Sequence, residues 1–220
     1  MDKKTLVIAG SSDGLGQAIE NRFRDGGYHV VAVSRRGQGH SHADLSDAQA
    51  TAQLFKELDA GPPLAGVIHN AMQFHRAPFW DTSEQVFEQV WRSMVMTAVH
   101  VAQQAIPRLQ SQGGGCLIFS GASGSLRAGP LFSAFSSAKF GLRGLTQALA
   151  REHGHEGIHV VHTVLDGLIW SDKTQQRFAA AQQANSMVPA DLAEVYWQVF
   201  HQARSTWTHE LDLRPMSASV

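Results

Sequence analysis

Short apolar runs alternate along the chain with segments whose apolar residues recur every three or four positions. The runs have the length of strands that are buried on both faces of a parallel sheet, and they lie at 6–9, 29–34, 66–71, 116–120, 158–165 and 210–214. The other segments predict helices at 17–23, 47–58, 83–94, 95–112, 132–153, 171–183 and 189–202. The helices at 83–94 and 95–112 are either continuous or abutting, and Ser46 is a candidate cap for the helix at 47–58. Strands that alternate with helices indicate an α/β fold, a parallel sheet with helices on both faces.

A glycine-rich turn joins the first strand to the first helix. Its Gly10, Gly14 and Gly16 have the spacing GxxxGxG, and no Lys-Ser/Thr pair follows, so it is not a Walker A loop. Gly10 can make a tight turn, Gly14 leaves room for a pyrophosphate, and Gly16 lets the helix pack close to the strand. The free N–H groups at the helix N-terminus favour a phosphate. The turn predicts a dinucleotide-binding loop; an ordinary glycine turn is the alternative interpretation.

Two arginines, Arg35 and Arg36, follow the second strand, where a doubly wound sheet holds the adenosine ribose. No acidic residue stands there to accept a hydrogen bond from a ribose 2′-hydroxyl. Guanidinium groups suit a 2′-phosphate, so we expect NADP(H) to be preferred over NAD(H). Asp13 in the glycine turn argues mildly against this preference, and a solvated strand end is the other interpretation of the arginines.

Composition agrees with one globular domain over residues 1–220, since 43% of the residues are hydrophobic and 17% are charged. The net charge of −1 gives no electrostatic case for nucleic acid or an anionic membrane, and no apolar run is long enough to span a bilayer. Cys116 is the only cysteine, which excludes an intrachain disulfide. Residues 1–4 lead straight into the first strand and leave no room for a signal peptide, so we expect a cytoplasmic protein.

The 12 histidines do not show the spacing of metal ligands. The sequence has no HExxH helix and no cysteine partners at zinc spacing, so we expect no metal. His69 and His162 fall on predicted strands, and we interpret both as packed or hydrogen-bonded core residues.

With these elements in order, the sequence resembles the short-chain dehydrogenase/reductase family along nearly its whole length. The motifs that carry the resemblance are the glycine loop, Asp44-Leu45, Asn70-Ala71, Pro107, Lys139 and the turn at Asp166-Gly167, where the family has Pro-Gly. The resemblance implies a Rossmann-like doubly wound sheet of about seven strands and hydride transfer between a nicotinamide cofactor and a small carbonyl or alcohol substrate. It also implies a homodimer or homotetramer formed through the helices around 95–112 and 132–153.

The cofactor-binding residues implied by the resemblance follow the dinucleotide from end to end. They are Arg35 at the 2′-phosphate, Asp44 and Leu45 at the adenine, Gly10, Ser12, Gly14, Leu15 and Gly16 at the pyrophosphate, Asn70 and Ala71 beside the adenosine-side ribose and the central strand, Lys139 at the nicotinamide ribose, and Ile169 near the carboxamide.

The sequence departs from the family at the residues that move protons. The family has a Tyr four residues before its Lys, and here the residue four before Lys139 is Phe135. The family's Asn falls on Met94, and its Ser falls on Gly121 or Ala122. None of these side chains can donate the proton that an alkoxide needs, and losing a general acid costs about 10²–10⁴ in rate.

Three interpretations stay open. In the first, the proton comes from a displaced donor: Ser123, Ser125, Ser133 or Ser136, Lys139 itself, or water. In the second, the substrate is an activated double bond or an iminium that needs no proton from the enzyme. In the third, the chain is a non-catalytic NADP(H)-binding sensor or a regulatory or assembly protein. The retained Lys139 and glycine loop favour an oxidoreductase with an atypical active site.

Overall fold

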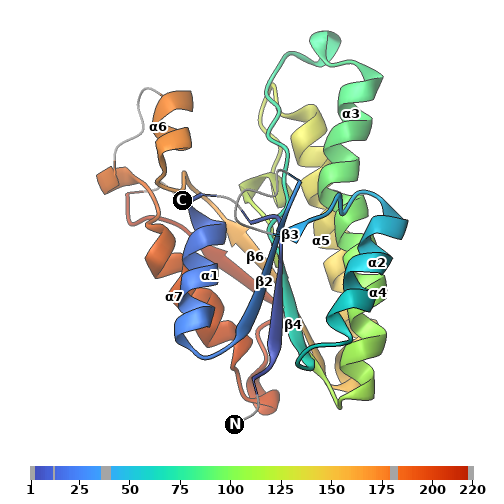
Figure 1. Cartoon of the computed structure of the whole chain (residues 1–220). Helices are drawn as coiled ribbons and strands as arrows, with labels where there is room; N and C mark the ends of the chain where they lie inside the picture. Colours follow the sequence, from blue (N-terminus) through green and yellow to red (C-terminus); the bar gives the residue numbers. More distant parts are fainter. Residues whose placement is uncertain (1–2, 12, 36–40, 179–182, 218–220) are drawn as a thin grey trace.

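A parallel sheet forms the centre of the fold (Figure 1). The computed structural model describes residues 3–11, 13–35, 41–178 and 183–217. These residues form a seven-stranded sheet in the order β3-β2-β1-β4-β5-β6-β7, with every pairing parallel. The strands are β1 (Thr5–Ala9), β2 (His29–Ser34), β3 (Ser41–His42), β4 (Leu64–His69), β5 (Gly115–Ser120), β6 (Ile158–Leu165) and β7 (Glu210–Leu213). The strand order reverses beside β1, so a crevice is expected at the carboxyl ends of β1 and β4.

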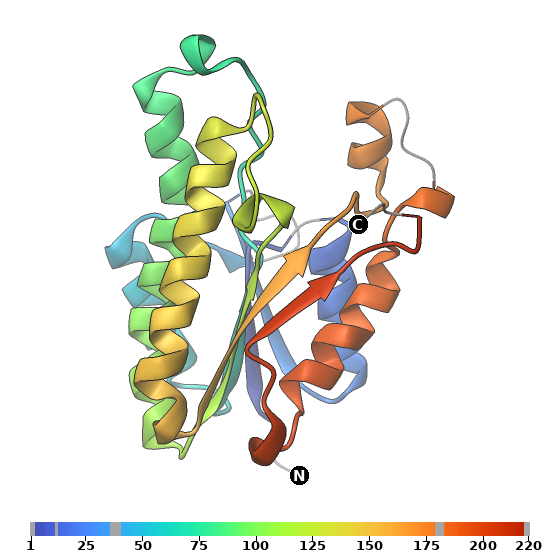
Figure 2. The ribbon, with the colours of Figure 1, turned by 180° about the vertical axis from the view of Figure 1, so that it is seen from behind.

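Helices cover both faces of the sheet, which confirms the predicted architecture. They are α1 (Leu15–Asp25), α2 (Ala48–Leu58), α3 (Glu84–Trp91), α4 (Thr97–Ser111), α5 (Ser133–His153), α6 (Asp172–Arg177) and α7 (Pro189–Phe200). Helices α1 and α7 lie on one face, and α2, α4 and α5 lie on the other (Figures 1 and 2). Helices α3 and α6 extend beyond the carboxyl ends of the strands (Figure 1). Among the described residues, no helix is long and apolar enough to cross a membrane.

Burial on both faces explains why the central strands read as continuous apolar runs. Val7 and Ala9 of β1 pack with residues of α2, α4 and α5, whereas Leu6 and Ile8 pack with residues of α1 and α7. Alternate residues of a strand point to opposite faces, so a strand with two covered faces needs apolar residues throughout.

The helix boundaries differ from the predictions in three places. The segment at 83–112 contains α3, a π-helical turn at Arg92–Met96 and α4, so a local widening separates the two helices. The helix predicted at 171–183 ends at Arg177, because Phe178 has an extended backbone. The edge strand β3 was not predicted, since its two residues are polar and exposed.

The predicted cap of α2 is wrong by one residue. Asp47, not Ser46, is the N-cap, and its carboxylate accepts a hydrogen bond from the N–H of Ala50 at 2.8 Å. Ser46 is engaged elsewhere, since its N–H and its hydroxyl both donate to the carboxylate of Asp44. Ser and Asp are both common N-cap residues, so residue type alone could not tell which of the two caps α2.

Candidate active site

The loop between β1 and α1 has a backbone that depends on glycine. Gly10 and Gly14 have φ angles of 95° and 94°, which residues with side chains rarely adopt. A Cβ on Gly10 would lie 2.5 Å from the Cα of Ala71, so this loop approaches the end of β4 more closely than alanine would allow. Asn70 fixes the approach, because its Nδ2 donates to the main-chain oxygen of Gly10 at 3.3 Å. The turn therefore brings the N-terminus of α1 to the crevice between β1 and β4.

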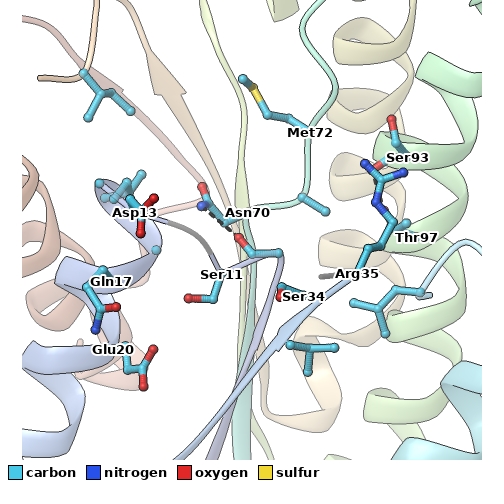
Figure 3. A pocket seen from close by; sticks show the side chains of 18 of the residues that line it. Ser11, Asp13, Gln17, Glu20, Ser34, Arg35, Asn70, Met72, Ser93 and Thr97 are labelled. Carbon is cyan, nitrogen blue, oxygen red and sulfur yellow. Dashed lines mark hydrogen bonds between the residues drawn. The ribbon is translucent and has the colours of Figure 1, made fainter. Parts of the chain in front are cut away.

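A pocket of about 760 Å³ occupies this crevice (Figure 3). The predicted cofactor-binding residues that line it are Gly10, Gly14, Leu15, Gly16, Arg35, Asp44, Leu45, Asn70, Ala71 and Ile169. In Figure 3, Asp13, Gln17 and Glu20 lie on the α1 side of the pocket, and Arg35 lies on the other side. Ser12 and Arg36 lie outside the described residues. The volume is in the range of sites that enclose a cofactor-sized molecule.

One end of the pocket carries opposite charges. The N–H and the hydroxyl of Ser46 donate to Asp44 Oδ1 at 2.9 and 2.7 Å. The hydroxyl of Ser46 is the main cause that holds the pKa of Asp44 below its ordinary value, and the positive charges of Arg35 and Arg92 act in the same direction. This end therefore presents a stable carboxylate and, from Arg35, a guanidinium to the pocket.

Lys139 is enclosed by the fold and does not line the pocket. It is 2% exposed, and its Nζ donates to the main-chain oxygen of Ser120 at 2.7 Å. Burial lowers the pKa of Lys139 to about 8. Its Nζ also lies 5.8 Å from the centre of the Phe135 ring. A lysine with this pKa gives up a proton near neutral pH more readily than an ordinary lysine does.

The residues that the sequence analysis aligned with the family's Tyr, Asn and Ser are apolar, and most of them pack in one buried cluster. Phe135 and Met94 belong to one cluster of buried residues, and Ala122 packs against it. Position 121 has no room for a side chain, since a Cβ on Gly121 would lie 2.2 Å from Nε2 of His162. Three apolar side chains thus meet where the family places three polar ones, which packs this part of the site without a hydroxyl or an amide.

None of the four candidate serine donors lines the pocket. Ser125 is fully buried, and its hydroxyl accepts a hydrogen bond from the N–H of Ala122 at 3.2 Å. Ser123 begins the short helical turn Ser123–Ser125. Ser136 is buried. Ser133 Oγ is buried, and the described part of the chain offers it no hydrogen-bond partner.

Several pocket-lining residues were missed by the sequence analysis: Met72, Ser93, Thr97, Ser171, Thr174 and Phe178. The pattern Ser171-x-x-Thr174 could have predicted the start of a helix at this edge of the pocket. Ser171 caps α6, and its hydroxyl accepts a hydrogen bond from the N–H of Thr174. Phe178 had no such signal. Its ring centre lies 5.8 Å from that of Phe74, which in turn lies 5.7 Å from that of Phe135. These rings join the pocket to the apolar cluster.

Within the described ranges, no group of three or more His, Cys, Asp or Glu side chains is placed to hold a metal ion.

Comparison with known proteins identifies the class of protein that this fold and site define. A family model described as short chain dehydrogenase matches residues 4–182. The chain therefore belongs to the short-chain dehydrogenase family, whose members are oxidoreductases.

Individual relatives are distant. The 3-amino-tetrahydro-pyrrolizinone reductase of Xenorhabdus hominickii is 28% identical over 183 residues, which cover 78% of this chain and 63% of that protein. The chain thus spans just under two thirds of that relative's length. The crystal structure of a short-chain dehydrogenase from Rhodopseudomonas palustris is 28% identical, has a TM-score of 0.83, and is matched over 96% of this chain and 98% of that one. An alcohol dehydrogenase from Thermococcus sibiricus, complexed with 5-hydroxy-NADP, has a TM-score of 0.86 at 18% identity over 100% and 99% of the two chains, and shows the same fold.

Proposed function

We propose that residues 1–220 form one NADP(H)-binding domain that transfers hydride to or from a small carbonyl, alcohol or activated double bond. The observation that carries the proposal is the contrast within the site. Every described residue that the sequence analysis assigned to the cofactor lines the pocket except Lys139, while the apolar side chains of Phe135 and Met94 pack in a buried cluster.

The pocket fits a nicotinamide dinucleotide. The positive φ angles of Gly10 and Gly14 would strain the backbone of any residue with a Cβ, so glycine keeps this turn open. The N-terminus of α1 offers free N–H groups for a pyrophosphate. Arg35 would meet a 2′-phosphate, and Asp44 would accept from the adenine. The preference for NADP(H) rests on Arg35, whose fork of donors suits phosphate oxygens. A bound nicotinamide supplies or accepts the hydride.

The missing Tyr limits which substrates can react. Phe135 contributes an apolar wall, and the ammonium of Lys139 lies 5.8 Å from the centre of its ring. A substrate that needs a strong acid at its oxygen would react slowly here, because no described side chain at the Tyr, Asn or Ser position can donate a proton. The family relatives named as reductases support reduction as the direction to test first.

The same proposal includes a homodimer or homotetramer through the segments around 95–112 and 132–153. Phe140 of α5 is 44% exposed, and Trp91, which lies against Gly141 of α5, is 39% exposed. Large apolar side chains on adjoining helices are typical of a surface that another subunit covers.

The test is NADPH consumption with a panel of ketones, aldehydes, activated alkenes and iminium ions. It compares the native chain with Phe135→Tyr and with Phe132→Tyr, which adds a hydroxyl to the same aromatic cluster away from the Tyr position. We expect slow native turnover, a rise of about 10²–10⁴ in carbonyl reduction for Phe135→Tyr, and no rise for Phe132→Tyr.

Two results would contradict the proposal. If only Phe135→Tyr turns over substrate, the native chain binds cofactor without using it. If NADPH does not bind at all, measured by its fluorescence, then the pocket has another ligand. Equal rates for native and Phe135→Tyr would instead support a proton donor elsewhere in the site.

A further inference from the structure

The described residues that line the pocket differ in charge from one part of it to another. The charged ones come from α1, from the loop before it and from the segments that follow β2 and β3: Asp13, Glu20, Arg35 and Asp44. The other described lining residues carry no charge. Three of them, Met72, Ile169 and Phe178, have large apolar side chains, and we call this part of the pocket the apolar end. In Figure 3, Met72 lies at the top of the pocket and Glu20 at the bottom.

This distribution of charge restricts what the apolar end can bind. A carboxylate or a phosphate is costly to take out of water unless a cation or several donors meet it. The described side chains of the apolar end offer neither, since Met72, Ile169 and Phe178 have no N–H or O–H group. The apolar end therefore favours a neutral group.

Phe178 extends the apolar end into a row of aromatic rings. Its ring centre lies 5.8 Å from that of Phe74, with 88° between the ring planes. The ring centre of Phe74 lies 5.7 Å from that of Phe135 and 5.8 Å from that of Phe132. Aromatic rings pair favourably at these separations, so one more ring can continue the row. Phe178 is half-buried, and it is the member of the row that lines the pocket.

Backbone strain accompanies this row in the loop before α5. Leu131 has a φ angle of 72°, a value that leucine rarely adopts. Such strain persists where the surrounding structure imposes it, and it is common at sites that clamp a ligand. The main-chain oxygen of Leu131 accepts a hydrogen bond from the N–H of Ala77 at 3.0 Å, and the next residue, Phe132, packs against Phe74. The segments that follow β4 and β5 are thus fixed to each other beside the rings.

Met72 exposes an apolar surface at the same end. Its side chain is 50% exposed, so a ligand that covers it removes apolar surface from water. The unbranched thioether adapts to the shape of a ligand, and its sulfur makes favourable contacts with aromatic rings. Met72 and Phe178 therefore both favour an aromatic group over an aliphatic group of the same size.

We propose that the apolar end binds a neutral aromatic group, which packs on Phe178 and Met72. The inference rests on the proposed function in one respect, since it takes this ligand to be the substrate. It then names the substrate class: aryl ketones, aryl aldehydes and aryl-conjugated alkenes that carry no carboxylate or phosphate on the ring.

Binding of three ketones tests the proposal without turnover. The ketones are acetophenone, cyclohexyl methyl ketone and 4-acetylbenzoate, which differ in aromaticity or in charge. Their dissociation constants are measured by ligand-observed NMR with the full chain, in the presence of NADP⁺, which cannot reduce a ketone, and again without it. Phe178→Ala removes the ring at the pocket. Phe140→Ala is the matched control, because Phe140 is 44% exposed on α5 and does not line the pocket.

We expect acetophenone to bind about tenfold more tightly than 4-acetylbenzoate and about threefold more tightly than cyclohexyl methyl ketone. Phe178→Ala should weaken the binding of acetophenone about tenfold, and Phe140→Ala should leave it unchanged. If Phe178→Ala does not fold, Phe178→Leu keeps an apolar side chain and should still weaken acetophenone about threefold. The proposal is overturned if acetophenone binds no more tightly than either of the other ketones, or if the Phe178 and Phe140 variants bind it equally well.

The inference and the proposed function fail in different ways. Acetophenone that binds through Phe178 but is not reduced by NADPH would support this site and contradict hydride transfer. Reduction of 4-acetylbenzoate in preference to acetophenone would support hydride transfer and overturn this inference. Rates of NADPH consumption with the two ketones, set beside their dissociation constants, separate these outcomes.

Discussion

The two ends of the site differ in how they meet solvent. At the adenosine end, Arg35, Asp44 and Ser46 present charged and hydroxyl groups to an open pocket. At the catalytic end, Phe135 and Met94 pack into a closed cluster. One end thus presents polar groups that suit the proposed nucleotide, and the other presents apolar groups where the proposed reaction would take place.

Under the proposed function, this difference separates cofactor binding from proton transfer. Contacts to phosphates and riboses supply affinity whether or not the reacting carbon has an acid beside it. The glycine loop can therefore be retained while the acid positions become part of the core. The sequence analysis gave Lys139 both a cofactor-binding and a catalytic role. In this structure its ammonium donates a hydrogen bond to the main-chain oxygen of Ser120.

The largest expected effect is the pH dependence of the free energy of unfolding that the buried His162 causes. Burial is the main cause that lowers the pKa of His162 to about 4, against the opposing charge of Glu210. The unfolded chain binds a proton on this histidine below about pH 6.5, and the folded chain does not until about pH 4. Stability is therefore complete above pH ~6.5 and falls as the pH drops through this window. Burial also lowers the pKa of His69, so the two histidines together make the free energy of unfolding several kcal/mol lower at acid pH than at neutral pH.

Urea unfolding across this window measures the effect. His162→Gln should reduce the slope of unfolding free energy against pH by about 1.4 kcal/mol per pH unit. His155→Gln, at an exposed position, is the control and should keep the native slope. An unchanged slope in His162→Gln would mean that His162 is protonated in the folded chain.

The next effect concerns the open end. Gly10→Ala places a methyl group 2.5 Å from the backbone of Ala71 at a φ angle of 95°, so the loop must move. We expect NADPH affinity to fall about a hundredfold, from a strain of about 3 kcal/mol. Gly27→Ala is matched, because Gly27 has a φ angle of 90° but open space around it and lies outside the pocket. It should lose stability and keep its NADPH affinity, measured by fluorescence titration.

A smaller effect tests the charge at the same end. Arg35→Ala removes the guanidinium that would meet a 2′-phosphate, and we expect NADPH to bind about tenfold more weakly, with NADH affected much less. Titration of both cofactors measures the difference. Arg151→Ala, at an exposed position of α5, is the control. An equal loss for NADPH and NADH would remove the argument for a 2′-phosphate site.

The smallest effect concerns the helix that follows the adenosine end. Asp47→Ala removes the N-cap of α2 and should lower the free energy of unfolding by about 1 kcal/mol. Ser46→Ala leaves that cap in place and removes a donor to Asp44, so it should change stability less. Chemical denaturation compares the two. A larger loss for Ser46→Ala would return the capping role to the residue that the sequence favoured.

Local signals sufficed for the elements that position the cofactor site. The strand before Gly10 was predictable because both faces of β1 are covered, which makes its apolar run continuous. The turn was predictable because a positive φ and a close approach to Ala71 both demand glycine. The sequence left open whether the helices at 83–94 and 95–112 are continuous or abutting, and it did not indicate the π-helical turn at Arg92–Met96 that joins them.

The catalytic end was only half predictable. The sequence indicated that Phe135 and Met94 stand at the acid positions, but not that they pack together with Ala122. It assigned His69 to the core without its link to Thr97, because that link joins residues on different elements. Phe178 reaches the pocket from beyond α6, at a position that the sequence analysis assigned to the interior of a helix at 171–183.

The sequence by itself determined the fold class and the glycine loop, because each depends on residue type at a local spacing; the loss of the usual acid stays a prediction. Only the tertiary structure decided that the buried Lys139 donates to the main chain of Ser120 and that His69 contacts Thr97. These relations depend on strand register and on which helix covers which face. A chain position has neither until the sheet has assembled.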